Sequence, residues 1–379
     1  MALVLNDDQQ MLKEAASGFI NQNAPVSKLR ELRDSGAEEA CSPDLWIEMA
    51  EMGWSGVLVP EDEGGAGFGM VGAGIIAEEM GRQLVASPYV ATAVMGATAL
   101  NIAGSKEQRG EIFPALLAGE LLMGLAVDEG SRHRPFNVTT KAERSGNGFK
   151  LSGRKTFVAD GHIADRLIVA ARTSGAVGDS GGITMFLVDA GTKGISRERA
   201  PMVDSRGYAE IEFTDVELTA DAVLGDVDGG GDVLTAVLNA GRACIAAEMV
   251  GSAAQAFEMT LSYIAERKQF GVPLGSFQAL QHRAAHLYTE IEMCRAMTLS
   301  ALQALDNNAD DAGVTVAIAK AKVGQVALLA AQEGVQFHGG MGMTDEFDIG
   351  LYLKRMKVAG EFLGDASYHG EQVALALGY

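Results

Sequence analysis

The spacing of apolar residues divides the chain into three regions. From residue 1 to about 124 the apolar positions recur at helical spacing. From about 125 to 228 the period changes to two and β-branched residues become more frequent, which predicts strands. Helical spacing returns after the triple glycine at 229–231. The pattern therefore predicts an α+β protein with a helical region at 1–124, a small all-β domain at 125–228 and a second helical region at 229–379.

Individual elements follow from the same pattern. In the first region, a helix is expected from about 104 to 119. The middle region contains five candidate strands, at 149–153, 156–159, 166–170, 183–188 and 209–213. In the third region, two long helices flank a turn at 267–278, and another helix is expected from about 313 to 337. One apolar seam repeats at spacings of four and three: Leu280, Ala284, Leu287, Ile291 and Cys294.

The turn between the two long helices contains polar side chains that could bind a ligand. It reads Arg-Lys-Gln-Phe-Gly-Val-Pro-Leu-Gly-Ser-Phe-Gln from Arg267 to Gln278. An arginine offers a planar fork of donors that suits a phosphate, and Gln269 can both donate and accept. The alternative is that Arg267 and Gln269 only cap a helix end. Small residues in the preceding helix, including Gly251, predict close helix packing.

Composition limits the partners. Asp and Glu total 50 against 30 for Lys and Arg, which gives a formal net charge of −20 and argues against nucleic acid or an anionic membrane as partner. The three cysteines suggest no disulfide framework. The N-terminal residues form neither a signal peptide nor a membrane span, so the cytoplasm is the expected location. No metal site is predicted.

Two separated motifs carry a family resemblance. The turn at 267–278 resembles the segment of acyl-CoA dehydrogenases that crosses to the FAD of a neighbouring subunit. Gln336-Phe337-His338-Gly339-Gly340-Met341-Gly342 resembles the segment of the same family that meets the FAD diphosphate. The resemblance covers essentially the whole chain and implies the fold of the family, with an N-terminal helical domain (1–124), a middle β-barrel-like domain (125–228) and a C-terminal four-helix bundle (229–379). Within the family it is closest to the pimeloyl-CoA dehydrogenase small-subunit type, judged from the segments 338–340, 348–350 and 354–355.

The resemblance implies α,β-dehydrogenation of an acyl-CoA thioester, in which a carboxylate takes the α-proton and the β-hydrogen leaves as hydride to FAD. It assigns a set of residues to FAD: Leu125, Val127, Asp128, Phe157, Ala159, Arg267, Gln269, Phe270, Gln278, Gln336, Gly339 and Gly340. Ala159 cannot offer the hydroxyl found in many members, and Asp128 replaces a threonine. Aimed at the flavin, the Asp128 carboxylate would lower the reduction potential. Phe157 is alternatively a core residue of its strand.

The expected substrate loop and the expected base both depart from the family. Ser131-Arg132-His133-Arg134 stands where members carry a substrate-facing loop. Arg132 and Arg134 either meet a CoA phosphate or acyl carboxylate, or lie in a solvated loop. The glutamate of the usual Tyr-Glu-Gly-Thr falls at Leu363, which would then line the substrate. The second known base position falls at Gly241, beside Arg242.

Three origins of the base stay open: Asp365, Glu248, or no conventional base in this chain. Glu248 lies two helical turns from Gly241, about 10 Å along the axis, too far for a simple replacement. The resemblance further implies a homo- or heterotetramer and electron-transfer flavoprotein as acceptor. The alternatives in function are a non-catalytic subunit that completes the FAD site of a glutamate-bearing homologue, and an oxygen-using flavoprotein on the same fold.

Overall fold

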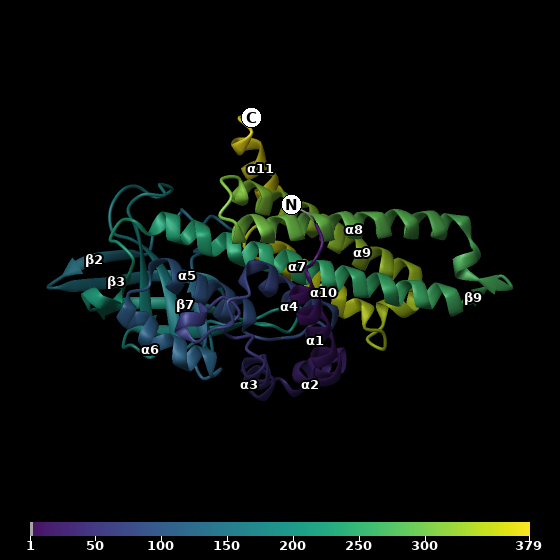
Figure 1. Cartoon of the computed structure of the whole chain (residues 1–379), viewed down its shortest axis with the longest axis horizontal. Helices are drawn as coiled ribbons and strands as arrows, with labels where there is room; N and C mark the ends of the chain where they lie inside the picture. Colours follow the sequence, from purple (N-terminus) through teal and green to yellow (C-terminus); the bar gives the residue numbers. More distant parts are fainter. Residues whose placement is uncertain (1–2) are drawn as a thin grey trace. The chain divides into compact units, whose positions relative to one another are not determined.

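The computed structural model describes residues 3–379 and contains the three kinds of region that the apolar pattern predicts (Figure 1). The first region holds α1 (Asp7–Asn23), α2 (Val26–Ser35), α3 (Pro43–Glu51), η1 (Glu61–Glu63), α4 (Gly69–Arg82), η2 (Val90–Gly96), α5 (Ala97–Ala103) and α6 (Lys106–Leu117). A capping box starts α6, because Ser105 Oγ accepts from Gln108 N at 3.1 Å and Ser105 N donates to Gln108 Oε1 at 2.9 Å. The helix expected at 104–119 is therefore confirmed, two residues shorter at each end.

The middle region forms one eight-stranded sheet. Its strands are β1 (Met123–Ala126), β2 (Lys141–Ser145), β3 (Gly148–Ala159), β4 (Arg166–Arg172), β5 (Ile183–Asp189), β6 (Ile195–Pro201), β7 (Gly207–Leu218) and β8 (Val223–Leu224). The order is β6-β7-β3-β2-β4-β5-β8, and β1 pairs with β4. The segments predicted as 149–153 and 156–159 are one strand, β3, which is interrupted by two register shifts against β7. Phe149 and Phe186 meet edge-on in the core with ring centroids 5.2 Å apart.

The sequence pattern missed three strands of useful length for physical reasons. All four residues of β1 are buried, so no alternation marks it. Strand β2 buries only Ala142, and β6 has no fully buried residue. Such strands lack the period-two signal on which a sequence prediction depends.

The third region consists of helices and one small hairpin. Its elements are α7 (Gly230–Glu266), β9 (Lys268–Gln269), β10 (Val272–Pro273), η4 (Leu274–Ser276), α8 (Gln278–Asp306), α9 (Ala312–His338), η5 (Gly339–Met343), α10 (Ile349–Glu361) and α11 (Ala366–Ala376). Helices α7 and α9 are long and apolar enough to cross a membrane, but 78% and 50% of their most apolar windows are buried in the protein. Burial of this kind is also a property of core helices in soluble bundles.

By its internal contacts the chain forms two compact units. One contains the residues up to Glu31, Met70–Val85 and Arg242–Tyr379, and the other contains Leu32–Gly69 and Ala86–Gly241. Helices α1 and α4 thus belong with the C-terminal helices rather than with their sequence neighbours. The three-domain boundaries at 124/125 and 228/229 stay a prediction.

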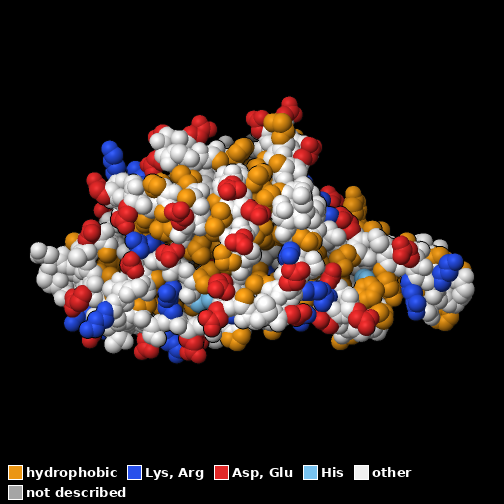
Figure 2. Space-filling view, turned by 90° about the horizontal axis from the view of Figure 1, so that it is seen from below, with side chains coloured by type: hydrophobic (Ala, Val, Ile, Leu, Met, Phe, Trp, Pro, Cys, Tyr) orange, Lys and Arg blue, Asp and Glu red, His pale blue; other side chains and the backbone are white. Residues whose placement is uncertain are grey.

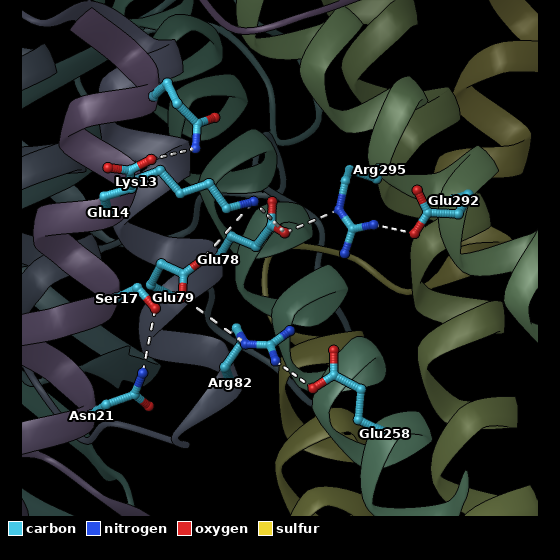
Figure 3. A network of polar contacts seen from close by, with 11 residues as sticks. Lys13, Glu14, Ser17, Asn21, Glu78, Glu79, Arg82, Glu258, Glu292 and Arg295 are labelled. Carbon is cyan, nitrogen blue, oxygen red and sulfur yellow. Dashed lines mark hydrogen bonds and ion pairs between the residues drawn. The ribbon is translucent and has the colours of Figure 1, made fainter. Parts of the chain in front are cut away.

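Ion pairs (Figure 3) and close glycine contacts connect α1 and α4 to the C-terminal helices. Lys13 of α1 lies 3.7 Å from Glu78 of α4, and Arg295 of α8 donates to the same carboxylate at 3.1 Å. Helix α4 also crosses α7 closely, since a Cβ on Gly251 would collide with the carbonyl oxygen of Glu78. The close helix packing predicted from the small residues of α7 is confirmed at Gly251.

Candidate functional site

The first candidate site lies on the hairpin between α7 and α8. Arg267, Gln269 and Phe270 are exposed, Phe270 to 90%. The hairpin extends past the ends of both helices, and Figure 2 shows basic side chains at this end among the scattered acidic ones. Neither the Arg267 nor the Gln269 side chain makes a hydrogen bond or ion pair with residues 3–379. Arg267 therefore contributes to the end of α7 through its backbone alone, whose N–H donates to Tyr263 O at 2.9 Å.

The second motif lies beside the first. Tyr263, in the last turn of α7, stacks on His338 at the end of α9 with ring centroids 4.3 Å apart. The Tyr263 hydroxyl lies 3.4 Å from His338 O. Gln336 and the two following glycines, Gly339 and Gly340, are exposed. The tertiary structure therefore brings the two motifs to one end of the helical unit.

This end of the unit fits a large anionic ligand or a partner's bound cofactor. A Cβ at Gly339 or Gly340 would meet no described atom within 4 Å, so the backbone there is open to approach. An unpaired arginine, two exposed amides and a bare aromatic ring are donors and surface that suit a diphosphate and a planar group. Gln278 at the start of α8 is exposed as well. These residues fit the FAD contacts that the resemblance assigns to them.

The β domain contributes a segment that the resemblance assigns to FAD, namely Leu125, Val127 and Asp128. Leu125 and Val127 are 7% and 6% exposed. The Asp128 carboxylate is held inside its own loop, at 2.8 Å from His133 Nδ1 and accepting from Arg134 N at 3.1 Å. Both carboxylate oxygens of Asp128 thus have partners within the loop, and its contact with a flavin stays a prediction. Its effect on a reduction potential remains an untested prediction.

Phe157 lies in a bulge of β3 rather than in the regular alternation of a core strand. Its φ is +55°, and its ring stacks on Tyr208 of β7 with centroids 4.4 Å apart and planes 19° apart. Both Phe157 and its neighbour Ala159 are half-buried. Tyr208 was not identified from the sequence, because only the pairing of β3 with β7 places it beside Phe157.

A buried ion pair supports the loop after β1 and was also missed. Lys155 Nζ, on a fully buried side chain, donates to Glu129 Oε1 at 2.7 Å and to Val127 O at 2.9 Å. Glu129 also accepts from the backbone N–H groups of Thr139 and Thr140 at 2.7 and 3.0 Å. Burial opposes ionisation of Glu129, but Lys155 and these donors lower its pKa to about 2.

Replacing Lys155 with methionine should lower the free energy of unfolding by about 3–5 kcal/mol, because it leaves a buried carboxylate unpaired. In the wild type, the contribution of Glu129 is complete above its ordinary pKa of 4.5 and is lost as the pH falls to about 2. Denaturant titrations between these pH values measure both effects. The exposed pair Lys150–Glu217 provides the control variant Lys150→Met. Equal stability of the two variants would contradict the prediction.

The substrate-loop arginines line a pocket. Arg132 and Arg134 are exposed and border an open space of about 440 Å³ together with Asn137, Thr139 and Val177. Neither arginine side chain makes a hydrogen bond or ion pair within residues 3–379. Both cations are thus available to an anionic group that enters the pocket.

The turn at the family's base position is tightly held but has no carboxylate on it. Leu363 is 6% exposed and has a φ of +58°, and Gly241 is buried in α7. The Leu363 carbonyl accepts from Arg242 Nε and from His369 Nε2, each at 3.1 Å. The Arg242 guanidinium also lies over the Tyr368 ring, 5.5 Å from its centroid.

The two carboxylates nearest in sequence have other partners. Asp365 caps α11, and its Oδ1 accepts from Tyr368 N at 2.7 Å. Glu248 accepts from Arg355 Nη1 at 3.1 Å in a pair whose side chains are both 2% exposed. A base must have a free lone pair in reach of the substrate. Glu248 is held in its buried ion pair, whereas Asp365 uses one oxygen for the cap and has no hydrogen bond to the other among residues 3–379.

Three family models match the chain end to end. "Acyl-CoA dehydrogenase, N-terminal domain" matches residues 6–120, the middle domain 127–219 and the C-terminal domain 228–378. The chain is 30% identical over 368 residues to the mitochondrial isovaleryl-CoA dehydrogenase of Solanum tuberosum, covering 94% of this chain and 87% of that protein. Among solved structures, the Tcur3481-Tcur3483 steroid ACAD is 30% identical with a TM-score of 0.88, covering 98% of both chains. The ChsE4-ChsE5 complex from Mycobacterium tuberculosis is 26% identical with a TM-score of 0.89, covering 100% of this chain and 99% of that one.

Proposed function

Because the chain belongs to the acyl-CoA dehydrogenase family and is an FAD-dependent oxidoreductase of that type, we propose that it works as one subunit of a heteromer. A homologous partner chain supplies the carboxylate that removes the α-proton of the acyl-CoA. FAD, when bound, accepts the hydride. This chain contributes Arg267, Gln269 and Phe270 to the FAD held by its neighbour.

One observation carries the proposal: both family positions for the base are occupied by residues that cannot take a proton. Leu363 and Gly241 are both buried, and neither carries a group that can accept a proton. A positioned general base contributes about 10²–10⁴-fold to such a reaction. The chain nonetheless keeps the exposed hairpin that fits FAD, which favours a role in completing a cofactor site. Two solved structures of similar chains carry paired names, Tcur3481-Tcur3483 and the ChsE4-ChsE5 complex, which supports a two-chain assembly.

The finer assignments extend this proposal. The segments 338–340, 348–350 and 354–355 favour the pimeloyl-CoA dehydrogenase small-subunit type within the family. The assembly is a heterotetramer in the cytoplasm, with electron-transfer flavoprotein as the acceptor. The length and polarity of the acyl group are set by the partner and the assembled pocket.

The test compares the chain alone with the assembled enzyme. Mixed with butyryl-CoA or octanoyl-CoA under argon, the homomer should bleach its flavin very slowly. Addition of a homologue with glutamate at the Leu363 position should restore bleaching, and Asp365→Asn should change neither result. Fast bleaching by the homomer that disappears in Asp365→Asn would assign the base to Asp365. Fast bleaching that survives in Asp365→Asn would refute both assignments.

The pocket at Arg132 and Arg134 leads to a separate prediction. Replacing both residues with alanine should raise the KM of the assembled enzyme for acyl-CoA about tenfold at low salt, since each charge-assisted contact is worth about 1.5–3 kcal/mol when desolvated and less in an open pocket. The effect should shrink as ionic strength rises, while flavin content stays constant. Lys150→Ala, on the exposed face of β3, is the control. An unchanged KM at low ionic strength would assign the loop to solvated surface.

A further inference from the structure

Lys320 is a buried cation with three backbone partners and, among residues 3–379, no carboxylate in ion-pair contact. It lies in α9 and is 1% exposed. Its Nζ donates to the carbonyl oxygens of Ala359, Gly360 and Gly364, each at 3.1 Å. An ammonium group has three N–H donors, so this geometry uses all of them. Lys320 belongs neither to the hairpin at 267–278 nor to the pocket at Arg132 and Arg134.

The partners of Lys320 are the end of α10 and the turn that follows it. Ala359 and Gly360 belong to the last turn of α10, where helix carbonyls lack intrahelical partners and the helix dipole is negative. Gly364 is the residue after Leu363 and has a φ of +107°. Lys320 therefore connects the helix end to the turn across Phe362 and Leu363. Arg242 and His369 hold the carbonyl between these contacts, that of Leu363.

We propose that Lys320 is a positioning residue whose ammonium group fixes the turn at 362–364 and thereby the place of Leu363. That Leu363 faces the acyl group rests on the proposed function, whereas the contacts of Lys320 do not. Lys320 touches neither substrate nor cofactor in this role. It acts only through the backbone of the turn, so its effect can be measured without turnover.

The ammonium contacts make the turn sensitive to pH. Burial lowers the pKa of Lys320 to about 7, and Arg242 of α7 acts in the same direction, while Glu361 of α10 and Asp365 at the start of α11 oppose it. Within the described residues, His369 and Tyr368 of α11 also contact this turn or its Arg242, and Lys357 of α10 pairs with Glu361. A neutral amine has two N–H donors and a lone pair, so one of the three carbonyls loses its donor above this pH.

As the pH rises above about 7, the free energy of unfolding should increase while the 362–364 turn becomes less ordered. The folded-state pKa of Lys320 lies below the ordinary value of 10.5, so the unfolded chain binds more protons between pH 7 and 10.5. The contribution of this group to the free energy of unfolding therefore rises with pH over that range. The two directions differ because global unfolding exposes Lys320 to water, whereas opening of the turn alone removes its carbonyl acceptors and leaves the side chain buried.

Backbone hydrogen exchange of the full-length, FAD-bound protein tests the proposal. Between about pH 6 and about pH 8, after correction for intrinsic rates, protection of the 360–366 segment should fall about tenfold in the wild type, as expected for one lost hydrogen bond to a charged group. Lys320→Gln, neutral at every pH, should show the low value throughout. Lys322→Gln on the same helix, where Lys322 pairs with Glu290, should behave as the wild type.

Two outcomes would overturn the proposal. One is constant protection of the 360–366 segment in the wild type across this pH range, a measurement that holds even if Lys320→Gln fails to fold. The other is a pH response that persists in Lys320→Gln and disappears in His369→Gln, which would assign the switch to the histidine. Neither outcome bears on whether a partner chain supplies the base, so the proposed function is judged separately.

Discussion

Replacing Leu363 with glutamate should raise the rate at which an acyl-CoA reduces the flavin of the homomer by about 10²–10⁴-fold, the usual contribution of a positioned general base. The turn is already held in place by Arg242, Lys320 and His369, so the new side chain enters a fixed backbone. Arg242, which donates to the Leu363 carbonyl, also favours an ionised carboxylate at this position. The buried site, in which Phe362 is 5% exposed, opposes ionisation, so activity should appear on the alkaline side of a raised pKa.

Anaerobic stopped-flow measurement of flavin bleaching by butyryl-CoA and octanoyl-CoA gives the rate. Leu363→Gln is the matched control, because it has the same shape and polarity without a base. Equal rates for the glutamate and glutamine variants would show that position 363 does not reach the α-proton in this chain. An already fast wild type would locate the base elsewhere.

Replacing Arg267 with alanine should give largely FAD-free protein. The arginine has no partner among residues 3–379, and the hairpin places it in solvent beside Gln269 and Phe270. One charge-assisted contact to a phosphate is worth about 1.5–3 kcal/mol, which corresponds to a loss of about 10–150-fold in FAD affinity. The flavin-to-protein ratio after gel filtration and a fluorescence titration with FAD measure the loss.

Lys268→Ala is the control for Arg267→Ala, since Lys268 is an exposed cation on the same hairpin. It should keep its flavin, because loss of charge alone does not remove a bidentate contact. Full flavin occupancy in Arg267→Ala would contradict the assignment of the hairpin to FAD binding. A similar loss of FAD affinity in both variants would show that the positive charge of the hairpin, rather than a specific arginine contact, binds FAD.

Much of the fold follows from local patterns. The long helices α7, α8 and α9 were expected because their apolar positions repeat over many turns, and β3, β4, β5 and β7 because they alternate or concentrate β-branched residues. The strands that were missed are either buried along their whole length, as β1 is, or bury at most one residue, as β2 and β6 do, so no period-two signal exists. The assignment of α1 and α4 to the C-terminal unit also has no local signal, because it depends on contacts with helices far away in the sequence, such as that of α4 with α7 at Gly251.

The sequence by itself determined the family, FAD as cofactor, and the absence of a carboxylate at Leu363 and Gly241, because each of these is a property of residue type and order. Only the tertiary structure decided what the remaining charged groups do. Glu248 is paired with Arg355, 107 residues away, and Lys320 holds Gly364, 44 residues away. Helix packing determines which residues so distant in sequence become partners. A buried charge is costly unless it is paired, so it pairs with a donor or acceptor on the neighbouring helix. No pattern along the chain encodes that choice.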